Sequence, residues 1–65
     1  MNMNKLNARI LDSGMTIDEV AELIGINGFS LYCKMKHPVT MTVGDAMKLK
    51  EVLNLSNQEA RDIFL

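Results

Sequence analysis

The apolar residues of this chain recur every three or four positions, in short stretches separated by Gly, Asn or Ser. This spacing places the apolar side chains on one face of a helix, so each stretch predicts a short amphipathic helix. The one alternating stretch, residues 39–43, has no second segment with which a strand could pair. The pattern therefore predicts an all-α protein with five helices.

The first two helices are predicted from their apolar spacing and their ends. Residues 4–13 form the first, with Leu6 and Ile10 four positions apart and Leu11 extending the apolar stripe. The second starts at a capping box, in which Thr16 is the N-cap residue and Glu19 the third helical residue. Its apolar face consists of Val20, Ala21 and Ile24.

The third helix is predicted to begin after Asn27, a residue that caps helix starts well, and to end at the His37-Pro38 pair. Leu31 and Met35, at positions i and i+4, anchor it to the core. Its outward residues are then Gly28, Phe29, Tyr32, Cys33 and Lys36.

A loop through Thr40 leads to two further helices. Thr42 with Asp45, and Ser56 with Glu59, form capping boxes that start the fourth and fifth helices. The buried stripe of the fourth is predicted to be Ala46, Leu49, Val52 and Leu53, and that of the fifth Ala60, Ile63 and Phe64.

Length and composition limit the protein class. Sixty-five residues allow one domain, spanning 1–65. A single cysteine, Cys33, cannot form an internal disulfide, and neither a membrane-length apolar run nor a signal peptide is present, so we expect a cytoplasmic protein without a membrane partner. With one Cys and one His, and no nucleophile beside a base, we expect no enzyme activity, small-molecule substrate, cofactor or metal.

The net charge of −1, from seven Lys and Arg against eight Asp and Glu, opposes DNA binding, but the charges are segregated. Residues 12–22 carry four acidic and no basic side chains. The stretch 34–50 contains one acidic residue, Asp45, together with His37 and four lysines: Lys34, Lys36, Lys48 and Lys50.

Residues 16–36 have the organisation of a helix-turn-helix, two capped helices joined by the tight turn at 25–27. In such a motif the second helix enters the major groove of DNA, and its positive dipole end favours a phosphate. The motif is therefore expected to recognise DNA and not to catalyse a reaction.

The segment 15–26 resembles the second helix and turn of the phage Cro and repressor class of regulators. Residues 31–36 resemble the end of the recognition helix in small Cro-like proteins of Gram-positive phages and prophages, and 46–56 and 62–65 look like their fourth and closing helices. The resemblance covers about residues 4 to 65. It implies a compact five-helix, lambda-repressor-like DNA-binding domain that represses transcription at an operator.

This chain departs from the family pattern at the reading positions. The first position of the motif, usually a Gln that contacts phosphate, is Ile17, and no Arg or Gln stands on the third helix. Base contacts would then come from hydrogen bonds of polar side chains and from Phe29 against thymine methyl groups. The candidate DNA-contacting residues are Thr16, Ile17, Asn27, Gly28, Phe29, Ser30, Tyr32, Cys33, Lys36 and His37.

Specificity from so small a module is expected to need two copies about 34 Å apart on the duplex, hence a homodimer at least on DNA. The predicted dimer surface is the fifth helix and its approach, with Leu55, Ile63, Phe64 and Leu65. A second hypothesis is a helix-turn-helix fold that binds protein, as an antirepressor or dimerisation module, with Phe29 and Tyr32 as anchors. The net charge and the missing Arg and Gln favour this alternative.

Overall fold

Five α-helices and one short 3-10 turn make up the chain in a computed structural model that describes residues 1–65. The all-α prediction is confirmed. The elements are α1 (Met3–Asp12), α2 (Ile17–Leu23), α3 (Gly28–Lys36), η1 (Pro38–Thr40), α4 (Val43–Val52) and α5 (Asn57–Phe64).

Each helix begins at a side chain that accepts a hydrogen bond from its first turn. The capping boxes at Thr16, Thr42 and Ser56 form as predicted, and Asn27 accepts from the Ser30 amide. Asn2 does the same for α1. These bonds satisfy amides that otherwise have no partner within the helix, so the sequence sets the helix starts locally.

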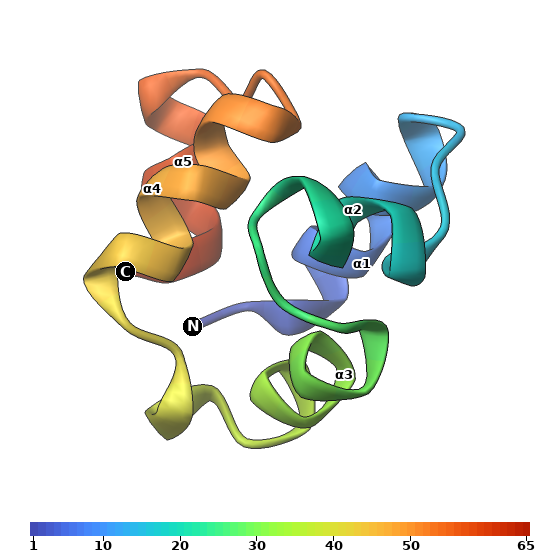
Figure 1. Ribbon diagram of the computed structural model, residues 1–65. Helices are drawn as coiled ribbons and strands as arrows, with labels where there is room; N and C mark the ends of the chain where they lie inside the picture. Colours follow the sequence, from blue (N-terminus) through green and yellow to red (C-terminus); the bar gives the residue numbers. More distant parts are fainter.

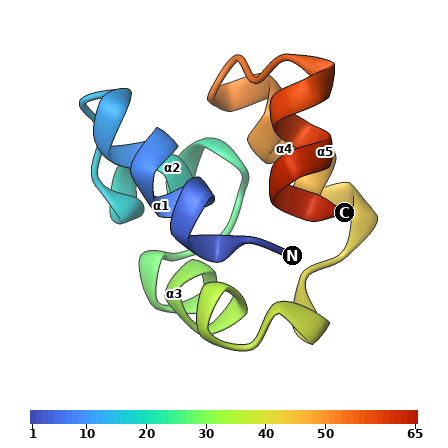
Figure 2. The same cartoon turned by 180° about the vertical axis from the view of Figure 1, so that it is seen from behind.

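The helices form two groups joined through a shared core. In Figure 1, α4 and α5 lie together on the left and α1 and α2 on the right, with α3 below them; the view from behind shows the same grouping (Figure 2). The Asn2 amide donates to the Ile63 carbonyl at 2.6 Å, which holds the start of the chain against α5. None of the five helices has the length and apolar character to span a bilayer.

One hydrophobic cluster is built from all the helices. Its eleven buried residues are Leu6, Ile10, Val20, Ala21, Ile24, Leu31, Met41, Leu49, Leu53, Leu55 and Ile63. Met15, Met35, Val52 and Phe64 are partly buried against it. The predicted inward faces of the second to fifth helices are therefore confirmed in outline, with Ala46 and Ala60 only half-buried.

Three sequence-based predictions differ from the structure. Leu11 is 69% exposed, because the buried face of α1 consists of Leu6 and Ile10 with Met3 beside them, and Leu11 lies outside this face. The segment after His37 is a 3-10 turn and not an irregular loop. Leu55 and Ile63, predicted to lie in a dimer surface, are buried in the chain's own core, so the predicted surface is wrong for these two residues.

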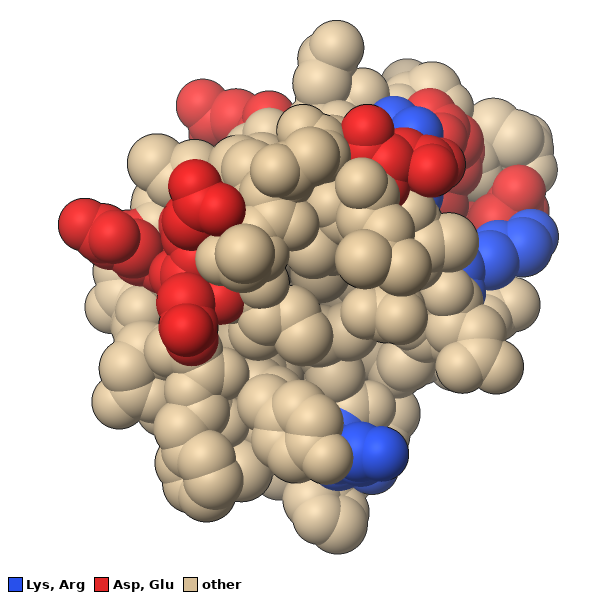
Figure 3. Space-filling model, turned by 90° about the vertical axis from the view of Figure 1, so that its right-hand side faces the viewer, with Lys and Arg blue, Asp and Glu red and all other residues tan.

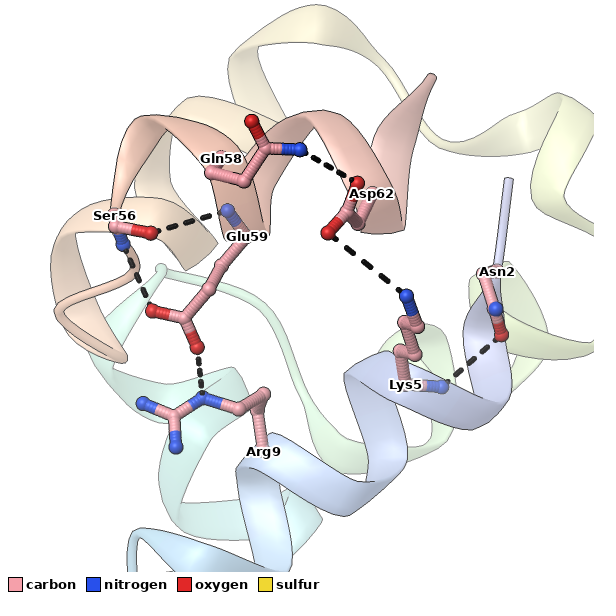
Figure 4. A network of polar contacts seen from close by, with 7 residues as sticks. All are labelled: Asn2, Lys5, Arg9, Ser56, Gln58, Glu59 and Asp62. Atoms are coloured by element: carbon pink, nitrogen blue, oxygen red, sulfur yellow. Dashed lines mark hydrogen bonds and ion pairs between the residues drawn. The ribbon is translucent and has the colours of Figure 1, made fainter.

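Ion pairs tie α1 to α5 across the surface (Figure 4). Arg9 Nε lies 3.1 Å from Glu59 Oε2, and Lys5 Nζ lies 3.9 Å from Asp62 Oδ2. The backbone amide of Ser56, and then the charge of Arg9, hold the pKa of Glu59 below its usual value. Glu59, which takes part in the capping box of α5, therefore also contacts α1. Because these side chains are half-buried or exposed, each pair contributes little to stability.

Candidate nucleic-acid interface

The candidate interface is built on the turn between α2 and α3. Gly25 adopts a φ of +86°, a left-handed conformation that residues with a side chain rarely adopt. The Ile26 amide donates to the Ala21 carbonyl at 3.0 Å, which closes the end of α2, and Asn27 Oδ1 accepts from the Ser30 amide at 2.7 Å. These contacts turn the chain directly from one helix into the next, and α2 packs closely on α3.

The outer face of α3 carries two aromatic side chains and a lysine. Phe29 is 74% exposed and Tyr32 48% exposed, as predicted, while Ser30 and Cys33 are half-buried. Lys36 Nζ lies 5.5 Å from the centre of the Tyr32 ring, within range of a cation–π contact. The exposed aromatic pair is an apolar surface that the core does not use.

Tyr32 and Lys36 also border a shallow pocket of about 230 Å³ shared with α1. Asn4 and Asn7 line it, together with half-buried Ile17. These two asparagines could not be identified as site residues from the sequence, since nothing in the local pattern of α1 places them beside α3. Two amides next to an exposed Tyr and Lys extend the polar part of the interface.

The residues at the start of α2 are less available for contact with DNA than predicted. The Thr16 hydroxyl accepts from the Glu19 amide at 3.1 Å, and Ile17 packs against the core. The side chain of Ile17, one of the candidate DNA-contacting residues, therefore has an internal apolar role.

The Asp18 carboxylate lies beside the N-terminus of α3. A Cβ atom added to Gly28 would overlap the carboxylate of Asp18 and would lie 3.2 Å from the Asp18 Cα. The carboxylate thus lies against the positive end of the α3 dipole, where a phosphate was expected. The φ of Gly28 is not left-handed, so its backbone conformation does not require glycine. The close approach of α2 and α3 is the reason for a small residue here.

We therefore expect Gly28→Ala to lower the free energy of unfolding by about 1 kcal/mol, although alanine favours helices over glycine, since the crowding outweighs that gain. In an Asp18→Ala background the same substitution should cost much less. Urea unfolding of the four proteins of this double-mutant cycle measures the coupling. An equal cost of Gly28→Ala with and without Asp18 would show that the two residues do not interfere.

Lys34 is not available for phosphate contact. Its Nζ lies 2.9 Å from Asp45 Oδ2 and donates to the Thr40 carbonyl at 3.2 Å. Burial by itself would raise the pKa of Asp45, but hydrogen bonds from Lys34 and from Thr42 outweigh it and hold that pKa below 3.8. The predicted basic zone thus loses one lysine to a structural pair that joins α3 to the start of α4.

The remaining charge is unevenly placed. Figure 3 shows the side of the molecule that lies on the right in Figure 1, where acidic side chains gather in clusters and basic ones appear only in small separate groups. Lys36 and His37 remain exposed at the end of α3, where His37 donates its amide to the Cys33 carbonyl. The cationic character of the interface is therefore concentrated at the C-terminal end of α3.

Comparison with protein-family models, with curated proteins and with solved structures finds no match to this chain.

Proposed function

We propose that this chain is a sequence-specific DNA-binding regulator of the Cro-like, lambda-repressor-like type, in which α2, the turn and α3 act as a helix-turn-helix. The observation that carries the proposal is the outer face of α3, which is free of core contacts and presents Phe29, Tyr32 and Lys36 beside the tight turn. A helix held in this way on a second helix has the shape that fits the major groove.

The side chains divide into two roles in this proposal. Lys36 contacts a phosphate, and His37 lies close enough on the chain to contact the same strand. Tyr32 and Ser30 donate or accept hydrogen bonds at base edges, and Phe29 packs on thymine methyl groups. Binding of two copies about one helical turn apart would block an operator and so repress transcription in the cytoplasm.

The position of Asp18 sets the orientation on DNA. Its carboxylate repels phosphate at the N-terminal end of α3, whereas Lys36 attracts phosphate at the C-terminal end. DNA backbone contacts are therefore expected around the end of α3 and η1. Few cationic side chains are expected to take part in binding.

A second function is favoured by the same surface. The exposed Phe29 and Tyr32, together with the scarcity of free cations, also suit an apolar protein contact, as in an antirepressor. The two functions differ in their response to salt, because phosphate contacts release counterions and an apolar protein contact does not.

The test is selection of bound duplexes from a random pool at about 0.1 M salt, followed by salt titration of the enriched sequence. Lys36→Ala is expected to weaken binding of all sequences and to reduce the salt slope by about 1, while Tyr32→Ala changes the sequence preference. Lys5→Ala, whose side chain faces α5, is the control and should leave both unchanged. Absence of enrichment and of binding at low salt would favour the protein-binding alternative.

A further inference from the structure

A second unpartnered surface lies between α4 and α5, and none of the proposed DNA-contacting residues lines it. It is an open groove of about 410 Å³. In α4 it is lined by positions 43, 46, 47 and 50, and in α5 by positions 57, 60, 61 and 64. Both sets follow the spacing i, i+3, i+4, i+7, so each helix presents one complete face to the groove. Five of these eight positions are apolar: Val43, Ala46, Met47, Ala60 and Phe64.

The lining is apolar and adaptable. Val43 is 78% exposed and Met47 67% exposed, while Phe64 is half-buried. Met41, a residue of the buried core, also lines the groove. Methionine side chains adjust their shape to a partner at low cost. Eight of the twelve lining residues are hydrophobic, so the groove is mainly apolar.

Two alanines leave room for a helix to approach the groove. Ala46 of α4 and Ala60 of α5 line it at corresponding positions and are only half-buried. Such small side chains let a third helix approach the backbones of α4 and α5 closely. The bulkier Val43, Met47 and Phe64 are then available to pack against that helix.

The charged side chains that line the groove have one sign. Lys50 and Arg61 line it, neither takes part in an ion pair, and no Asp or Glu is among the lining residues. The nearby carboxylates of Glu59 and Asp62 are turned to Arg9 and Lys5 of α1. The groove therefore combines an apolar surface with two uncompensated cations.

We infer that the groove binds an amphipathic helix of a partner protein, one with apolar residues at i, i+3, i+4 and i+7 and with acidic residues beside that stripe. The apolar stripe fills the groove, and the carboxylates pair with Lys50 and Arg61. A second copy of this chain fits less well, because a two-fold contact of groove with groove would offer no Asp or Glu side chain to Lys50 and Arg61. The inference does not depend on DNA binding.

The experiment uses two pools of displayed amphipathic helices with a randomised apolar stripe. The flanking positions are Glu in one pool and Lys in the other. The Glu pool should be enriched on the full chain, and the best peptide should shift the amide resonances of Ala46, Met47 and Ala60. Replacing both Lys50 and Arg61 by Glu should transfer the preference to the Lys pool, a change of about tenfold in relative affinity.

Met47→Lys is expected to weaken the selected peptide at least about tenfold without affecting folding, since the side chain is exposed. Leu11→Lys is the matched control, because Leu11 is similarly exposed but lies on α1, outside the groove. Equal enrichment of the two pools, or resonance shifts confined to other surfaces, would overturn the inference. So would self-association of the chain that Met47→Lys abolishes, because the occupant would then be a second copy.

Discussion

Leu31→Ala is expected to lower the free energy of unfolding by about 2–5 kcal/mol. Leu31 is fully buried and is the only residue of α3 in the buried core. A chain of 65 residues has roughly 3–10 kcal/mol of total stability, so the loss is a large part of the whole. Far-UV circular dichroism during urea titration measures it.

The control for this substitution is Leu11→Ala, which changes the same side chain on an exposed part of α1. It should alter the free energy of unfolding by no more than about 0.5 kcal/mol. If the two variants unfolded at the same urea concentration, α3 would not be anchored through Leu31. Because the candidate interface is on α3, that result would also remove its rigid support.

Lys34→Met is expected to lower the free energy of unfolding by about 1.5 kcal/mol near pH 7. The methionine keeps the apolar stem but removes the ammonium from Asp45, and the two side chains are only 23% and 14% exposed. Without the pair, the Asp45 carboxylate still accepts from the Thr42 amide, and the Asp45 amide still donates to the Thr42 hydroxyl, but the carboxylate loses its charged partner. α3 then loses one of its links to α4.

The pH dependence of stability gives a second measurement of the same pair. The pKa of Asp45 is lowered in the folded protein relative to 3.8. Its contribution to stability is therefore fully present above the unfolded pKa and is lost as pH falls through the folded pKa. The wild type should lose more stability than Lys34→Met between about pH 5 and about pH 2. Equal losses, or an equal effect of the exposed control Lys48→Met, would contradict the role of the pair.

The two predictions share a structural reason. Leu31 holds α3 in the core, Gly28 lies against Asp18, and Lys34 pairs with Asp45. This arrangement leaves the opposite side of the helix exposed. Leu31 and Lys34 therefore affect the proposed function through the position of α3 and not through contact with DNA.

The helix boundaries could be predicted well because their causes are local. The capping side chains of Thr16, Asn27, Thr42 and Ser56 bond to amides three residues further along, so the sequence pattern alone identifies them. The exposure of Phe29 and Tyr32 followed from helical spacing once Leu31 was assigned to the core.

The availability of individual side chains could not be predicted in the same way. Lys34 and Lys36 are two positions apart and look alike in the sequence, yet Lys34 faces Asp45 of α4 whereas Lys36 lies over Tyr32. Asp18 reaches Gly28 only because α2 and α3 pack closely. Each of these outcomes depends on a residue of another helix.

The sequence by itself thus determined where the helices begin, most of the residues that form the core and that α3 has an apolar outer face. Only the tertiary structure decided that Met41 and Leu55 are buried, that Lys34 is paired and that α4 and α5 leave an apolar groove with two unpaired cations. The physical reason is the distance along the chain over which each interaction acts. Capping and helical periodicity act within one or two turns, whereas burial and charge pairing are set by how helices distant in the chain pack together.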